Sequence, residues 1–393
     1  MRHRTVAIVV TLLSMLGLTG VGGLAGAHDE KVVTIGVIAP LDAGLVEFGA
    51  GIRNSVQLAV DQANKNKVIP GWEIELVAID DSSDPAVGVA NAPQLVDDEH
   101  VIGVVGTYNS GVAAELFPLL APTSLAMISP GNTLASLTLG DDVANPVRPY
   151  EGYFRLVASD SEQAPFLAES VNNLEYENVA VVSEEKAVSQ GLADAFVSAF
   201  TGTITVQQTV PDGATDFSGF LDEALAGAAP DAIFFGGEYE VAATLRTQAT
   251  ERGFEGPIVG GDGIKGQDYV DAAGAESEGD LASSVGVPAA KLKTAKKFFK
   301  DYKLGGFDEP ATDFGPYAYD ATNLLVLAAR DVLDGEDEIP ADARAQVVSI
   351  LQDAKGKGVT GRLQFDEFGD TTNVVFTLYR VQGDPLAFKP IKA

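Results

Sequence analysis

Strand-like and helix-like segments alternate along almost all of this 393-residue chain. Residues 32–39 form a continuous apolar run, which is typical of a strand buried on both faces of a parallel sheet. Apolar residues at helical spacing follow it between Ile52 and Ala63. The alternation restarts after Pro149 and Tyr150. It predicts an α/β protein with two doubly wound parallel-sheet lobes that face one another.

The predicted strands can be given by residue range. They cover 32–39, 73–79, 101–105, 125–128, 153–157, 178–183, 203–209, 231–235 and 257–259. The main helices are predicted over 86–96 with a break at Pro93, from a cap at Asp160 or Ser161 to Leu174, and near 289–302, 315–333 and 341–354. Near the C-terminus, segments 361–365 and 374–381 are predicted to pair with each other as strands.

Residues 1–27 have the features of an export signal. Arg2 and Arg4 give a positive start, residues 6–18 are apolar, and 25–27 form a small-x-small cleavage site. The apolar part is shorter than the roughly 20 residues that a spanning helix needs. We therefore expect a mature, soluble protein that begins near His28 and lies in the periplasm or outside the cell. An uncleaved membrane anchor is the alternative.

The chain has no cysteine and only three histidines. This composition excludes disulfides, thiolate metal sites, cysteine nucleophiles and a lipid anchor on an N-terminal cysteine. It also leaves no material for a histidine triad or a histidine-rich metal site. Nucleophile-elbow, phosphate-loop and zinc-protease motifs do not occur. We therefore expect no catalytic residues, no metal and no cofactor, and a binding protein rather than an enzyme.

The formal net charge is −30, and it becomes −32 once Arg2 and Arg4 leave with the signal. Such a polyanion is repelled by nucleic acid and by anionic membrane surfaces, so nucleic acid is not an expected partner. The acidic run 80–85 suggests a cation site, but a solvated turn with a helix cap at Asp84 is the preferred interpretation.

Two loops rich in glycine and hydroxyl groups follow predicted strands. They cover 106–111, after the strand 101–105, and 129–133, after the strand 125–128. In open α/β sheets ligands bind at the carboxyl ends of the strands, where helix N-termini present free N–H groups. The pair of loops therefore predicts a site for one carboxylate. Alternatively, Thr107 and Thr133 are ordinary helix caps or turn residues.

Several short segments, in their order and spacing, resemble a known family. They are 35–40 with 48–49, 80–85, 101–103, 128–130, 154–155 with 160–163, 235–237, 319–321, and 361 with 365–366 and 369–370. The chain resembles the type I periplasmic substrate-binding proteins of ABC transporters, within them the leucine/isoleucine/valine-binding branch. The resemblance runs from about Val32 to the C-terminus.

The resemblance implies a fold of two lobes with three hinge crossings. Lobe 1 would hold residues 31–157 and 288–358, and lobe 2 would hold residues 158–287 and 359–393. The crossings would fall near Val157, Val287 and Val359, and the ligand would lie between the lobes.

The resemblance also implies roles for individual residues. Thr107 and Thr133 would bind the ligand carboxylate, and the carbonyl of Gly131 would accept from the ligand ammonium. Asp262 would pair with that ammonium, at a position where the branch usually has glutamate. Phe48 would cover the ligand side chain.

One position departs from the branch. The tyrosine that usually follows the glycine pair is replaced by Glu238, with Tyr239 next. Either the register shifts by one residue, or the pocket carries an extra carboxylate, which puts a purely aliphatic ligand in doubt.

Together these features predict a monomeric exported receptor. It would capture an amino acid, branched-chain or similar, and deliver it to a membrane ABC permease. Two alternatives stay open: a receptor or sensor for a non-amino-acid carboxylate or amide, and an exported hydrolase with an unrecognised carboxylate site.

Overall fold

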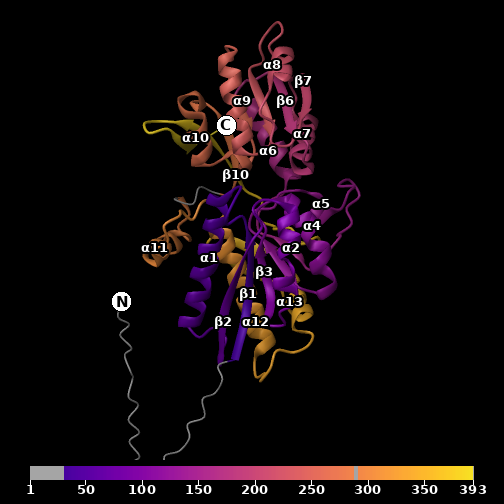
Figure 1. The fold of residues 1–393 in the computed structure, drawn as a ribbon, viewed down its shortest axis with the longest axis vertical. Helices are drawn as coiled ribbons and strands as arrows, with labels where there is room; N and C mark the ends of the chain where they lie inside the picture. Colours follow the sequence, from indigo (N-terminus) through magenta and orange to yellow (C-terminus); the bar gives the residue numbers. More distant parts are fainter. Residues whose placement is uncertain (1–30, 287–290, 393) are drawn as a thin grey trace, which may run out of the picture. The chain divides into compact units, whose positions relative to one another are not determined.

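The structure, a computed structural model, describes residues 31–286 and 291–392. The predicted export signal at 1–27 and the crossing near Val287 lie outside the described residues. Within the described part, two separate parallel-stranded sheets are each covered by helices on both faces, as the alternation predicts (Figure 1).

The first sheet, with the helices packed on it, is called lobe 1. Its five strands are all parallel. In spatial order they are β2 (Trp72–Asp80), β1 (Lys31–Ala39), β3 (Val101–Gly106), β4 (Ala126–Ser129) and β5 (Tyr153–Arg155). Strand β1 is buried from Val33 to Ala39 because helices cover both of its faces, which accounts for its unbroken apolar sequence.

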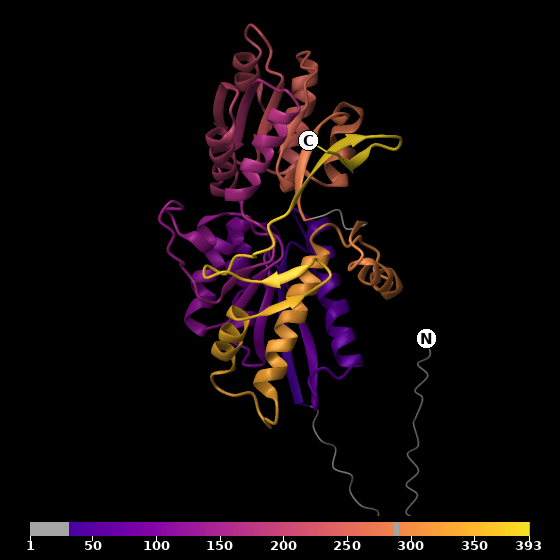
Figure 2. The ribbon, with the colours of Figure 1, turned by 180° about the vertical axis from the view of Figure 1, so that it is seen from behind.

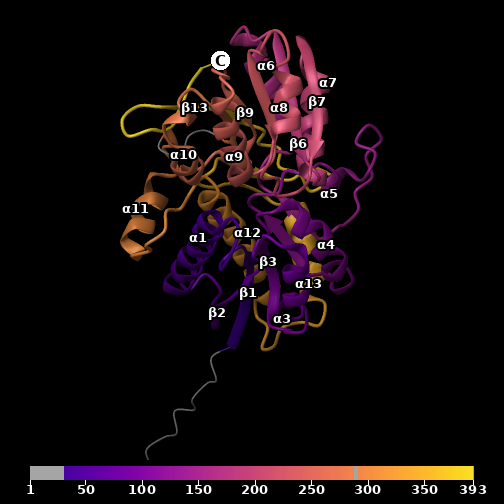
Figure 3. The ribbon, with the colours of Figure 1, turned by 45° about the horizontal axis from the view of Figure 1, so that its top comes forward.

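Helices α1 and α12 cover one face of this sheet, and α2, α3 and α4 cover the other. Helix α11 packs beside α1 (Figure 3). The helices of lobe 1 are α1 (Val46–Lys65), α2 (Pro85–Asn91), α3 (Pro93–Val96), α4 (Ser110–Leu120), α5 (Ser136–Leu139), α11 (Lys296–Gly305), α12 (Gly315–Leu333) and α13 (Ala343–Gln352). The break between α2 and α3 falls at Pro93, as predicted.

The second sheet and its helices are called lobe 2. Five parallel strands are followed at one edge by an antiparallel hairpin. In spatial order they are β7 (Thr203–Val210), β6 (Asn178–Glu184), β8 (Ala232–Gly236), β9 (Ile258–Gly260), β10 (Leu281–Val285), β13 (Phe376–Gln382) and β14 (Ala387–Pro390). Its helices are α6 (Asp160–Asn173), α7 (Ala187–Ala199), α8 (Ser218–Ala224), α9 (Tyr239–Glu251) and α10 (Gln267–Ala273).

The predicted strand pairing near the C-terminus is wrong. Strand β12 (Arg362–Gln364) pairs with β11 (Lys355–Lys357), and β13 pairs with β10 and β14. The sequence shows which segments are extended, but strand partners are chosen by packing between distant parts of the chain. Strand β10, the partner of β13, is absent from the predicted set.

The β11–β12 hairpin lies against lobe 1. The Asp320 carboxylate in α12 accepts from the N–H groups of Val359 and Thr360 at 2.9 and 2.8 Å, and Figure 2 shows the hairpin beside this helix. Further along, the Phe365 ring meets that of Phe154 at the end of the first sheet, with centroids 4.8 Å apart. We therefore propose that the third crossing lies between residues 372 and 375 rather than near Val359.

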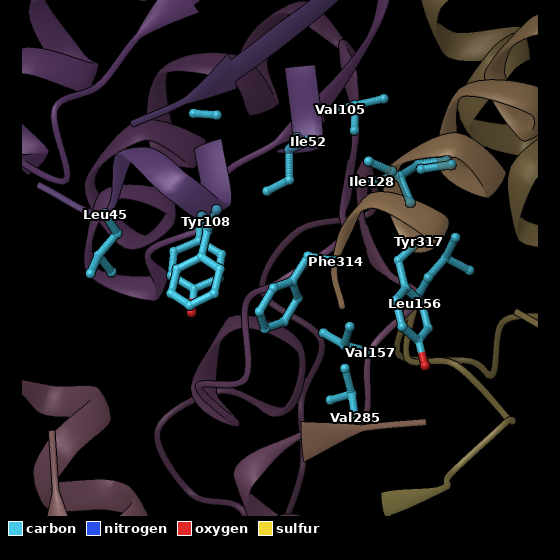
Figure 4. Packing of buried hydrophobic residues seen from close by; sticks show 14 of the residues in the cluster. Leu45, Ile52, Val105, Tyr108, Ile128, Leu156, Val157, Val285, Phe314 and Tyr317 are labelled. Atoms are coloured by element: carbon cyan, nitrogen blue, oxygen red, sulfur yellow. The ribbon is translucent and has the colours of Figure 1, made fainter. Parts of the chain in front are cut away.

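One apolar cluster contains buried residues at the ends of β5 and β10. Val157 follows β5 and Val285 ends β10, and both are buried together with Phe314 and Tyr317 beside or in α12 (Figure 4).

Candidate functional site

A cavity lies between the two lobes at the carboxyl ends of their strands. Its volume accessible to water is about 60 Å³. One water needs roughly 10–15 Å³ of such volume. It has room for about four to six waters. Lobe 1 contributes Tyr108, Asn109, Ser110, Gly131 and Thr133; lobe 2 contributes Asp160, Val188, Ser189, Leu192, Gly237, Glu238, Asp262 and Gly263.

Side-chain hydrogen bonds lock the two predicted loops of lobe 1 together. The Ser129 hydroxyl donates to the Thr107 carbonyl at 2.9 Å, and the Asn132 side-chain amide donates to the Tyr108 carbonyl at 2.8 Å. From the other side, the Ser110 hydroxyl accepts from the Thr133 N–H at 3.1 Å. The loops therefore form one rigid wall of the cavity.

Helix α4 begins in this wall, at Ser110. The first N–H groups of a helix have no partner inside the helix, and its dipole makes that end positive. Asn109, in the N-cap position, makes no side-chain cap bond. The wall of lobe 1 is therefore suited to an anion such as a carboxylate.

Arg155 stabilises the same wall through hydrogen bonds to residues that follow Thr133. Its guanidinium is fully buried, pairs with Asp370, and donates to the Leu134 carbonyl at 2.8 Å and to the Thr138 hydroxyl at 2.5 Å. The loop that carries Thr133 is thus fixed from behind by a buried charge whose partner comes from the C-terminal part of the chain.

Asp160 is the most unusual group in the cavity. It is buried at the first turn of α6, and neither of its carboxylate oxygens has a hydrogen-bond partner within the described part of the chain. Burial, and next the charge of Asp262, raise its pKa to about 8, although the Thr133 hydroxyl acts in the opposite direction. A buried carboxylate without a partner needs a proton or a cation.

Sequence analysis assigned Asp160 or Ser161 only as a helix cap, and this is wrong. The N-cap position is Ser159, whose N–H donates to the Glu162 carboxylate at 3.2 Å. The Ser-x-x-Glu capping box was the available signal, because it leaves the residue after the serine free for another role.

Asp262 lies beside Asp160 in the wall of lobe 2. Its carboxylate accepts from the Gln163 amide at 2.7 Å, and the other amide atom, the Gln163 oxygen, is buried without a partner among the described residues. Burial raises the pKa of Asp262 to about 6, which the Gln163 bond partly offsets. The carboxylates of Asp160 and Asp262 therefore present acceptors to the same cavity.

Glu238 bridges the two lobes. Its carboxylate accepts from the Asn109 side-chain amide of lobe 1 at 2.7 Å and from the Lys186 ammonium of lobe 2 at 3.1 Å. Glu238 lines the cavity and Tyr239 is not among its lining residues, so we propose that the extra carboxylate belongs to the pocket. Tyr239 is buried at the start of α9.

An aromatic cluster stands behind the lobe 1 wall. Phe48 stacks on Tyr108 with centroids 4.8 Å apart, and the edge of Phe314 meets both rings. Tyr108 lines the cavity, whereas Phe48 lies behind it. Tyr108 is a cavity residue that sequence analysis did not identify.

The structure brings four of the seven predicted residues to the cavity: Gly131, Thr133, Glu238 and Asp262. Thr107 is buried next to them, but its hydroxyl donates to the Asn109 carbonyl at 2.7 Å and accepts from Asn132 at 3.1 Å. A direct contact of the Thr107 hydroxyl with ligand therefore has no support in this geometry, and we propose that this side chain shapes the loop.

No cluster of three or more potential metal-ligating side chains occurs in residues 31–286 and 291–392. Over the same ranges, no helix has the length and apolar character needed to cross a bilayer.

The fold and the site together define a two-lobed binding protein with its ligand pocket at the interface. A family model described as "Periplasmic binding protein" matches residues 32–385. The Leu/Ile/Val-binding protein homolog 3 of Brucella melitensis is 30% identical over 374 residues, which cover 94% of this chain and 96% of that protein. The Leu/Ile/Val-binding protein BraC3 of Rhizobium johnstonii is 31% identical over 90% of this chain and 92% of its own.

Among solved structures, the branched-chain amino acid transporter substrate-binding protein LivJ of Streptococcus pneumoniae, in complex with isoleucine, superposes with a TM-score of 0.76. It is 26% identical and covers 92% of this chain and 100% of its own. The chain belongs to the periplasmic binding protein family, a family of substrate-binding receptors, and the predicted resemblance to its type I, leucine/isoleucine/valine-binding branch is confirmed.

Proposed function

We propose that this protein is an exported receptor that captures an amino acid between its lobes and delivers it to an ABC importer in the membrane. The observation that carries the proposal is Asp160, a cavity-lining residue whose buried carboxylate has no hydrogen-bond partner among the described residues. The relatives described above support the ligand class, because their names refer to leucine, isoleucine and valine or to branched-chain amino acids.

The proposed binding mode follows from the two walls. The ligand carboxylate lies at the N-terminus of α4 and against the Thr133 hydroxyl, where N–H and O–H donors converge. The ligand ammonium lies between Asp160 and Asp262, with the Gly131 carbonyl as a further acceptor. A buried ammonium gives both carboxylates the cation that they lack.

We also propose how the protein is exported and in what form it acts. The signal at 1–27 is removed on export, and the mature chain acts as a soluble monomer without a lipid anchor. It binds its ligand reversibly and catalyses no reaction, and it has no nucleic-acid partner, in keeping with its net charge of −30.

Mass analysis of small molecules released from the purified protein tests the proposal. We expect one amino acid per protein molecule, and N-terminal sequencing of exported material should begin near His28. A released carboxylic acid without an amine, or turnover of added substrates, would contradict the proposed function.

A further inference from the structure

The Asn109 side chain carries an acceptor that nothing in the described part of the protein uses. Its amide nitrogen donates to Glu238, and a carboxylate can only accept, so the orientation of the amide is fixed. Its oxygen, Oδ1, is consequently turned away from Glu238 and is buried without a partner among the described residues. Asn109 lines the cavity, so a ligand can reach this side chain.

The surroundings of Glu238 are short of positive charge. The Lys186 ammonium that lies 3.1 Å from Glu238 also lies 2.9 Å from Asp212 and 3.6 Å from Glu184. Three carboxylates thus share one ammonium. This negative potential favours hydrogen-bond donors at this side of the cavity and disfavours further acceptors or anions.

The apolar part of the cavity is formed by few large side chains. Of its thirteen lining residues, only Tyr108, Val188 and Leu192 have large apolar or aromatic side chains. A branched aliphatic side chain would therefore leave Oδ1 of Asn109 without a donor and would lie against charged groups. Burying such an acceptor unpaired is unfavourable.

Building on the function proposed above, we propose that the ligand is an amino acid whose side chain carries an N–H or O–H donor, and that Oδ1 of Asn109 recognises this donor. Glu238 has a positioning role, because it fixes the orientation of the Asn109 amide. A neutral amide, a hydroxyl or a cationic ammonium on the ligand side chain can each supply this N–H or O–H donor.

Three amino acids of nearly identical shape separate this proposal from shape selection. Asparagine, leucine and aspartate have the same branched outline, but their side chains end in a donor with an acceptor, in methyl groups and in a carboxylate. In calorimetric titrations of the full mature protein at pH 7.5, we expect asparagine to bind roughly 10- to 100-fold more tightly than leucine. Aspartate should bind most weakly. Threonine against valine gives a second isosteric pair, and lysine distinguishes a cationic donor from a neutral one.

The variant Asn109→Leu keeps the branching and the number of side-chain heavy atoms and removes the acceptor. It should bring the asparagine-to-leucine affinity ratio close to one, whereas Asn145→Leu, on an exposed loop, should leave the ratio unchanged. If a variant folds poorly, the comparison of ligands on the unaltered protein still tests the proposal.

Leucine or valine binding as tightly as its polar isostere would overturn this inference while leaving the proposed function intact. Failure of every amino acid to bind would overturn the proposed function itself. A ratio unchanged by Asn109→Leu would remove Asn109 from the recognition.

Discussion

The two walls of the cavity have opposite chemistry. Lobe 1 contributes the first turn of α4 and hydroxyl groups and contributes no carboxylate to the lining, whereas lobe 2 contributes Asp160, Glu238 and Asp262. One wall therefore mainly donates hydrogen bonds and the other accepts them. A zwitterion satisfies both walls only when it lies between them, so ligand binding and lobe closure are coupled.

The wall of lobe 2 carries the larger energetic cost when it is empty. Asp160 and Asp262 are buried with raised pKa values, while the lobe 1 wall uses backbone groups that helix formation orients in any case. From this difference we expect substitutions in the lobe 2 wall to weaken ligand binding strongly. Substitutions of single hydrogen-bond donors in the lobe 1 wall should weaken it less.

Asp262→Asn is expected to have the largest effect. It keeps the shape of the side chain but leaves the ligand ammonium without one of its two anions, and truncating a buried charge pair costs roughly 2–5 kcal/mol. Amino-acid affinity should fall about 30- to 3,000-fold. Calorimetric titration measures this, with Asp308→Asn, an exposed position, as the matched control. A loss below about threefold in a folded variant would mean that the ammonium is held elsewhere.

The second largest effect is expected from pH, which should change the affinity for the ligand. Burial raises the pKa of Asp160 to about 8 and that of Asp262 to about 6, and an ammonium binds only to the ionised forms. Affinity should therefore rise with pH, on the order of 100-fold between pH 6 and pH 8, with release of protons on binding. Titrations in buffers of different ionisation enthalpy measure both quantities. A flat profile between pH 6 and pH 8 would contradict the assignment of these two acids.

The stability of the ligand-free protein should move in the opposite direction. Asp160 ionises at a higher pH in the folded state than in the unfolded chain, where its pKa is near 3.8. Its ionisation therefore destabilises the fold, and this penalty grows as the pH rises from about 4 to about 8. Asp160→Asn should raise the melting temperature at pH 8, although it weakens ligand binding. A lower melting temperature for this variant would show that Asp160 is paired in the free protein.

Thr133→Val tests the wall of lobe 1. It removes one hydroxyl donor near the ligand carboxylate and leaves the N–H groups of α4, so affinity should fall about 10-fold, less than for Asp262→Asn. Thr201→Val, at an exposed position, is the control. An effect of Thr133→Val larger than that of Asp262→Asn would reverse the order of the two walls.

Lys265→Met should have the smallest effect. The Lys265 ammonium of lobe 2 pairs with Asp313, which precedes α12 of lobe 1, at a partly exposed place outside the cavity lining. Such pairs contribute about 0.2–1 kcal/mol, so all ligands should bind up to about fivefold more weakly, by the same factor. Small-angle scattering should still show a smaller radius of gyration with ligand. A factor that differs between ligands would place Lys265 in the recognition itself.

Much of the fold could be predicted from the sequence because apolar runs and helical spacing are local signals. The break at Pro93 and the placement of α12 are examples. Strand partners near the C-terminus could not be predicted, since they depend on which edge of the second sheet is free. The position of the cavity was predicted in part: the loops after β3 and β4, which are rich in glycine and hydroxyl groups, contribute to its lining.

The directions of side chains within those loops could not be predicted. Thr107 has the expected residue type, yet local hydrogen bonds occupy its hydroxyl. Asp160 has the features of a helix cap until the structure shows that Ser159 precedes the helix and that the carboxylate enters the cavity. Both outcomes depend on backbone geometry over two or three residues.

The central claim is that the acceptor wall of lobe 2 holds a ligand ammonium. The most direct test is a calorimetric comparison of the tightest-binding amino acid with its desamino analogue, which keeps the carboxylate and the side chain. We expect the analogue to bind at least about 30-fold more weakly to the native protein and within a few-fold of the amino acid in the Asp160→Asn, Asp262→Asn double variant. Equal binding of the analogue and the amino acid by the native protein would contradict the account.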